Sequence, residues 1–305
     1  YFERFLQRFP TLPDLARAEE QDVLRHWEGL GYYSRARNIH KTARLIVDSH
    51  GGSFPEQAAQ LLELPGIGRY TAGAVASFAF DRRAPILEAN TLRLYSRLLG
   101  YTGDPRSSEG QEILWSFAEQ VLPARQPGRF NQALMELGHT VCSPVRPACE
   151  RCPVNICCGA FARGLQETIP QPARKPEITA VTETSVIIQR GDACLLVLRR
   201  PGERWAGMWD FLRFEGDVGD IPLPELPERI RAVAGLDVAA PELLTEIRHS
   251  VTRYRITLRC FTVQSSRGTP KTEPREHRWV PVSELHGYPL SVTGRKLARL
   301  MSDPS

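Results

Sequence analysis

The stretch 64–68 reads Leu-Pro-Gly-Ile-Gly and lies between two helical patterns, the second rich in small residues. Gly66 and Gly68 allow a tight turn and leave the backbone N–H groups at the start of the second helix open to an anionic oxygen. Such a hairpin binds phosphate without reading base sequence. The alternative is an ordinary connection between two helices. Ser53, followed by Glu56, predicts a capping box for the first helix, which is expected to end at Glu63.

A second decisive stretch holds four cysteines with the spacing Cys-x6-Cys-x2-Cys-x5-Cys, namely Cys142, Cys149, Cys152 and Cys158. Clustering of this kind indicates a metal site and not a disulfide framework. Thiolates within a short loop favour a 4Fe-4S cluster, with zinc as the rival. Cys157 is an alternative fourth ligand and is expected to be a spectator.

The charge of the chain permits a nucleic-acid partner without demonstrating one, because the net charge is only +4. Arg146 and Arg151 in the cysteine loop predict a local basic surface for DNA. No apolar run approaches the roughly 18 residues of a membrane span, and no secretory leader precedes the first helix, so a cytoplasmic location is expected. The chain begins at Tyr1 in the phase of an amphipathic helix, which we interpret as a truncated N-terminus.

Hydrophobic periodicity predicts a multidomain fold, all-α over residues 1–163 and α+β over 181–305, joined by a proline-containing linker at 164–180. Apolar residues spaced three and four apart predict helices at 24–27, 36–47, 58–62, 71–79, 91–99, 112–121 and 131–142. Alternation with a period of two predicts strands at 184–188, 193–198, 255–261 and 278–280, with helices at 225–234 and 293–300.

These features together resemble the endonuclease III superfamily of helix-hairpin-helix glycosylases, most closely the adenine glycosylases of the MutY family. The matching segments are 29–38, 64–74, 86–97 and 130–138, the last reading Phe-Asn-Gln-Ala-Leu-Met-Glu-Leu-Gly. The resemblance implies an iron-sulfur glycosylase domain followed by a Nudix-like domain. It also implies a bacterial, nucleoid-associated monomer that removes adenine paired with 8-oxoguanine or guanine in double-stranded DNA.

The resemblance implies a catalytic role for Tyr70, Glu88 and Asn90. Tyr70 stands where related glycosylase-lyases carry a Schiff-base lysine, so a hydrolase without lyase activity is implied. Glu88 replaces the family's catalytic aspartate, and Asn90 is expected to position it. The extra methylene shifts the carboxylate by about an ångström, enough to affect the rate. The alternatives are a tyrosine packed in the core and a first-turn acidic residue that favours the helix dipole.

A flipped base leaves a gap in the duplex, and Tyr32 matches the family residue that wedges beside the lesion. The alternative is that Tyr32 and Tyr33 pack between helices. The family's general-acid glutamate lies upstream of the position that matches Tyr1. The chain is therefore expected to be a fragment, or else a lesion binder that does not cleave.

The C-terminal part resembles the Nudix fold but lacks the hydrolase helix and its metal carboxylates after Phe214, so no pyrophosphatase activity is expected. Val251, Thr252 and Arg253 stand where the family usually has Phe-Ser-His against 8-oxoguanine. Loss of the aromatic side chain is expected to weaken discrimination. The alternative for these residues is a polar strand edge.

Two rival functions stay open. One is an endonuclease III-like pyrimidine glycosylase with lyase activity, which Tyr70 and the second domain argue against. The other is a non-catalytic iron-sulfur DNA-binding protein, which the absent acid and Glu88 favour.

Overall fold

The computed structural model describes residues 1–172, 177–216, 219–270 and 275–302 and divides the chain into two compact units. One unit comprises residues 45–175, and the other combines residues 1–44 with the chain from 176 onward. This division by compactness differs from the expected limits 1–163, 164–180 and 181–305, which stay a prediction. Residues 173–176, inside the predicted linker, lie outside the described residues, and the first strand of the sheet already begins at Thr179.

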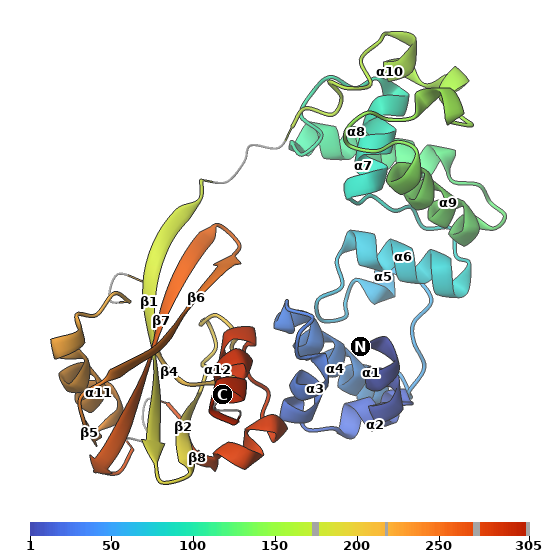
Figure 1. Cartoon of the computed structure of the whole chain (residues 1–305). Helices are drawn as coiled ribbons and strands as arrows, with labels where there is room; N and C mark the ends of the chain where they lie inside the picture. The colour runs from blue at the N-terminus through green and yellow to red at the C-terminus, as the bar shows by residue number, and fades with distance from the viewer. Residues whose placement is uncertain (173–176, 217–218, 271–274, 303–305) are drawn as a thin grey trace. The chain divides into compact units, whose positions relative to one another are not determined.

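The unit of residues 45–175 is helical, as its periodicity predicts (Figure 1). After α4, which covers Tyr33–Ser49, its elements are α5 (Ala58–Leu61), α6 (Arg69–Phe80), α7 (Ala89–Leu99), α8 (Ser108–Val121), α9 (Pro127–Thr140), η1 (Cys149–Arg151), η2 (Asn155–Cys157) and α10 (Gly159–Ala162). The α9 helix ends at Thr140, earlier than the expected Cys142. Buried Leu94, Tyr95, Leu114 and Trp115 form the core between α7 and α8.

The small residues of α6 allow close packing. A Cβ atom at Gly73 would collide with the carbonyl oxygen of Pro85, and one at Gly128 of α9 would collide with that of Ser77 in α6. The hairpin helix is therefore fixed against its neighbours through contacts that only glycine permits.

The predicted capping box at Ser53 is wrong. The N-cap of α5 is Gln57, with no side-chain hydrogen bond, and Glu56 instead pairs with Arg82. Pro55 explains the error, because a residue that precedes proline is disfavoured in the helical conformation and the helix can begin only beyond it. The α5 helix also ends at Leu61, before the expected Glu63.

The other unit begins with four helical segments: α1 (Phe2–Arg8), α2 (Leu12–Arg17), α3 (Glu20–Trp27) and the first part of α4. Phe9, Val23 and Leu24 are buried here, and the Phe9 ring lies 5.4 Å from the ring of His26 in α3. Across the described part of the chain, no helix combines the length and apolar character needed to cross a membrane.

A mixed sheet dominates the same unit (Figure 1). Its strands are β1 (Thr179–Arg190), β2 (Ala193–Leu198), β3 (Trp209–Asp210), β4 (Leu212–Phe214), β5 (Asp237–Val238), β6 (Glu242–Val251), β7 (Tyr254–Arg267) and β8 (His277–Pro281). The long strands β1 and β7 pair in parallel from Thr179 with Tyr254 to Gln189 with Gln264, and the other pairs are antiparallel.

Alternate residues of β1 face two separate cores, which explains the period of two. Ile187 contributes to the core covered by α12 (Val292–Ser302), and Val186 and Ile188 contribute to the one covered by α11 (Leu226–Ala234). The 3-10 helices η4 (Leu223–Glu225) and η5 (Val282–Gly287) precede α11 and α12. The predicted long strands and both helices are confirmed.

The strand β6 was not predicted. Its apolar residues Leu243, Leu244, Ile247 and Val251 follow a helix-like spacing, because a bulge between Leu243 and Thr245 interrupts the alternation. Pairing with β7 overrides the local pattern.

Candidate functional site

The hairpin has the geometry that its glycines predict. Gly66 has a φ of 75°, in the region that favours glycine, and Gly68 is the extended N-cap of α6. Both glycines are exposed, whereas Leu64 is buried beneath them. The first amides of a helix lack acceptors within it, and a Cβ atom at Gly68 would meet no heavy atom within 4 Å. The amides are thus accessible to an anion.

Tyr70 of α6 lies within the electrostatic influence of Glu88. Burial raises the pKa of Tyr70, and the negative charge of Glu88 raises it further. Burial also raises the pKa of Tyr95 in α7, again with a contribution from Glu88. The predicted carboxylate therefore lies within electrostatic range of the predicted phenol and of a second tyrosine, Tyr95, that the sequence did not single out.

Glu88 is the N-cap of α7 and not a residue of its first turn. Its Oε1 accepts hydrogen bonds of 2.9 Å from the backbone N–H groups of Asn90 and Thr91. In return, the N–H of Glu88 donates to the Thr91 hydroxyl at 2.8 Å, which completes a capping box. Preceding Ile86 and Leu87 are buried and fix the entry into the helix. The half-buried carboxylate is consequently held in one orientation.

Asn90 positions Glu88 through its backbone and not through its side chain, contrary to the simplest expectation. The Asn90 Oδ1 atom accepts a 3.0 Å hydrogen bond from Nη2 of Arg93. Arg93 in turn donates to the carbonyl oxygens of Cys142 and Gly138, at 2.7 and 2.5 Å. The asparagine thereby ties the start of α7 to the end of α9.

Arg97, four residues beyond Arg93, is buried and joins α7 to the cysteine loop. Its Nη1 atom lies 3.3 Å from Sγ of Cys142 and donates to the Ser143 carbonyl at 2.7 Å. Sequence reasoning missed both arginines. The available signal was their spacing of four, which places them on one face of the helix that Glu88 caps.

The four predicted cysteine ligands line one hollow, together with Arg97, Pro147 and Asn155. Burial raises the pKa of the Cys149 thiol, and the neighbouring thiols of Cys142, Cys158 and Cys152 raise it further. Cys157 is exposed and does not line the hollow.

Within the described ranges, no group of three or more His, Cys, Asp or Glu side chains is arranged to hold a metal ion. A single ion needs its ligands closer together than an iron-sulfur cubane does, because each thiolate of a cubane binds a different iron atom. Four thiols line one hollow, and the buried guanidinium of Arg97 lies beside Cys142, an arrangement that suits an iron-sulfur cubane better than a single ion.

Tyr32 belongs to the unit that contains the sheet. Its φ is 46°, its side chain is 72% exposed, and Arg35 lies 4.9 Å from the ring centroid. Packing between helices, the alternative considered above, holds for the buried Tyr33 and not for Tyr32. The exposed ring is available to a ligand.

Thr252 and Arg253 form the two-residue turn between β6 and β7, and Val251 pairs with Tyr254 at its base. Thr252 has a φ of 50°, and its hydroxyl donates to the Val251 carbonyl at 2.8 Å. Arg253 is exposed and donates to the Tyr254 hydroxyl at 3.0 Å. These residues are at a hairpin tip, not along a strand edge.

Two family models match the chain. Residues 1–120 match the HhH-GPD superfamily base excision DNA repair protein, and residues 184–300 match the NUDIX domain. The adenine DNA glycosylase of Mus musculus is 32% identical over 349 residues, which cover 99% of this chain and 68% of the mouse protein. The chain belongs to the adenine DNA glycosylase family. Its human relative is also 32% identical, over 98% of this chain and 64% of the human protein.

Among solved structures, a thermostable thymine-DNA glycosylase is 27% identical to this chain, with a TM-score of 0.48. The match covers 53% of this chain and 75% of the thymine-DNA glycosylase chain. Membership of the adenine DNA glycosylase family confirms both the resemblance and the fold class expected from the sequence: a helical glycosylase region followed by a Nudix-like sheet domain.

Proposed function

We propose that this protein hydrolyses the N-glycosidic bond of adenine paired with 8-oxoguanine or guanine in double-stranded DNA. The single observation that supports this best is Glu88, whose carboxylate is held by two backbone amides and whose charge raises the pKa of Tyr70, the residue that stands where related lyases carry a lysine. A carboxylate in this position stabilises the positive charge that develops on the sugar, or attacks it. Proton donation to the departing base belongs to a different group, for which the family resemblance implies a glutamate upstream of the position that matches Tyr1.

The test is a duplex with adenine opposite 8-oxoguanine, incubated with this chain and, in parallel, with a form extended upstream to carry the family's glutamate; base release is expected from the extended form. We expect free adenine and a strand that breaks only after alkali treatment, because Tyr70 cannot form the Schiff base of a lyase. Direct strand cleavage with a complex that borohydride traps would instead identify a lyase. Tight binding without base release would identify a non-catalytic protein.

We assign Cys142, Cys149, Cys152 and Cys158 as ligands of a 4Fe-4S cluster. Such a cluster supplies a rigid, redox-capable core to the loop when bound. The chain's own residues then present Arg146 and Arg151 from this loop to phosphates. The same proposal gives the glycosylase domain the limits 1–163, the linker 164–180 and the Nudix-like domain 181–305, in a monomer.

If the hairpin binds phosphate, a substitution at Gly68 should lower the affinity for DNA and leave the stability of the fold nearly unchanged. Gly68→Ala should weaken DNA binding roughly tenfold, a loss of about 1.4 kcal/mol, because the methyl group stands in the open space that a phosphate would enter. Folding should lose no more than about 1 kcal/mol, the scale of an N-cap exchange.

Fluorescence anisotropy and thermal denaturation measure the two effects. The control is Ser108→Ala, which changes an exposed residue at the start of another helix, α8, in the same unit. Equal DNA affinities of the two variants would contradict the assignment of the hairpin.

The turn between β6 and β7 is proposed to contact 8-oxoguanine, and Tyr32 to wedge beside the flipped base. Combining Thr252→Val with Arg253→Ala removes the hydroxyl and the guanidinium while keeping the branched shape at residue 252. The preference for adenine opposite 8-oxoguanine over adenine opposite guanine should fall about five- to thirtyfold, as for the loss of one or two hydrogen bonds of about 1 kcal/mol each.

Ratios of single-turnover rates on the two duplexes measure this preference. The control Thr252→Ser keeps the hydroxyl and should keep the ratio. A double variant with the original ratio would show that the turn does not read the lesion.

A further inference from the structure

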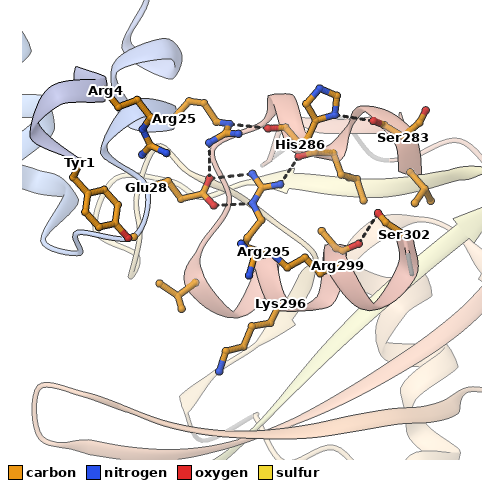
Figure 2. Close-up of a pocket in the computed structure, with 15 residues that line it drawn as sticks. Tyr1, Arg4, Arg25, Glu28, Ser283, His286, Arg295, Lys296, Arg299 and Ser302 are labelled. Carbon is orange, nitrogen blue, oxygen red and sulfur yellow. Dashed lines mark hydrogen bonds and ion pairs between the residues drawn. The ribbon is translucent and has the colours of Figure 1, made fainter. Parts of the chain in front are cut away.

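A cavity of about 670 Å³ lies in the unit that contains the sheet, between the N-terminal helices on one side and η5 with α12 on the other (Figure 2). Neither the hairpin nor the cysteine loop contributes to it. Its walls come from segments at opposite ends of the sequence: Arg25 of α3 donates a 2.7 Å hydrogen bond to the carbonyl of His286, 261 residues away.

The charge of this cavity is strongly positive. The cationic side chains that line it are Arg4, Arg25, Arg295, Lys296 and Arg299. The one carboxylate in the lining, Glu28, is already paired: its two oxygens accept from Arg295 at 2.7 and 3.0 Å. A net positive charge therefore remains for a ligand.

Two of the cations build the wall. Arg295 also donates to the carbonyl oxygens of Leu285 and Tyr288, at 2.9 and 2.6 Å, which fixes η5 against α12. Burial lowers the pKa of Arg25; Glu28 raises it, and Arg295 and Arg4 lower it again. Crowding of positive charge around Arg25 is relieved when an anion enters the cavity.

Two other cations are free to bind. Lys296 and Arg299 are exposed, and neither has an ion pair or hydrogen bond to any part of the chain that the structure describes. They are three residues apart on α12, so they project from neighbouring positions of one helix face. Figure 2 shows Arg299 near the anchored Arg295 and the Lys296 side chain extending away from the Arg295–Glu28 ion pair, at the edge of the cavity. Ammonium and guanidinium groups with this spacing suit phosphate oxygens.

We propose that this cavity binds backbone phosphates of DNA as a second contact surface, distinct from the hairpin and from the turn between β6 and β7. The proposal rests on the proposed function for the choice of DNA as the polyanion. Its contribution is to affinity and not to the chemical step, because each neutralised phosphate releases counterions whatever the base sequence.

The test compares Lys296→Ala/Arg299→Ala with the full chain on an undamaged duplex over a series of salt concentrations. The slope of log binding constant against log salt should become shallower by about 2, close to 0.9 for each lost phosphate contact. Single-turnover excision at saturating enzyme should stay unchanged. An unaltered slope would overturn the proposal.

The matched control is Arg229→Ala/Arg231→Ala, which removes equal charge from α11 on the opposite face of the sheet. An equal change of slope in this control would reduce the effect to net charge and also overturn the proposal. A third arm titrates inorganic phosphate at constant ionic strength. Suppose that phosphate raises the melting temperature of the wild type but not that of Lys296→Ala/Arg299→Ala (the α12 variant), while both proteins have the same salt slope on DNA. That result would assign the cavity to free phosphate instead.

The two proposals fail separately. A wild type that releases no adenine, yet has a steeper salt slope than the α12 variant, would refute the proposed function and leave the DNA contact standing. Normal excision with equal slopes would do the reverse.

Discussion

Glu88→Gln is expected to reduce adenine excision by at least about a hundredfold, the scale for removing one preorganised electrostatic contact from a transition state. The Oε1 atom of glutamine still accepts from the amides of Asn90 and Thr91, so the cap and the fold should remain. The charge that stabilises the sugar cation is lost. Single-turnover excision and equilibrium DNA binding measure the two consequences, and binding should change little.

Two further variants of Glu88 separate chemistry from structure. Glu88→Ala removes both charge and cap and should also destabilise the protein by about 1 kcal/mol. Glu88→Asp keeps both, since aspartate is a favoured N-cap and the residue that the family resemblance implies here, and should remain active. Glutamine at position 88 with normal activity would refute a catalytic role for this carboxylate.

Cys149→Ser is expected to abolish the proposed cluster and, with it, most DNA affinity. A hydroxyl is a poor substitute for a thiolate ligand, and the loop between Cys142 and Cys158 has little regular structure to hold it in place otherwise. The wild type should contain about four iron atoms and four sulfides per chain, as a 4Fe-4S cluster requires. The variant should lose both, together with the visible absorption of the cluster.

Cys157→Ser is the matched control, because Cys157 is in the same loop but exposed and outside the hollow. It should retain iron, sulfide and DNA binding. If Cys157→Ser lost iron and Cys149→Ser retained it, the fourth ligand would be Cys157 and not Cys149. A wild type that binds one zinc ion would refute the cluster itself.

The hairpin and the grouping of the four cysteines around one hollow were predictable because their members are close in sequence. Gly66 and Gly68 indicate a turn because glycine has no side chain to restrict the backbone. The four cysteines lie within one short loop, which keeps their side chains near one another. The nearness of Tyr70 to Glu88 was accessible only through resemblance, since no periodicity relates a residue on α6 to the cap of α7.

Other parts of the site could not be predicted from the sequence, because they depend on arginines that are buried, whereas arginine usually lies at the surface. Arginine is rarely buried, and nothing local indicates that Arg93 and Arg97 would be held by carbonyl groups of the cysteine loop. In the sheet, Arg213 is likewise buried, with Glu183 at 3.3 Å and Asp210 at 3.5 Å. The pair with Glu183 forms only because β4 pairs with β1 in the sheet.

The sequence by itself determined the family, the two kinds of secondary structure and the grouping of four cysteines in one loop, because those signals are short-range. Tertiary structure alone decided how the Glu88 carboxylate is oriented, which arginines join α7 to the cysteine loop, and that α3 and α12 enclose a basic cavity. The physical reason is that hydrogen bonds and ion pairs between residues as far apart as Arg25 and His286 depend on the folded path of the chain. The sequence shows which residues can donate hydrogen bonds, but not which acceptors they reach in the folded chain.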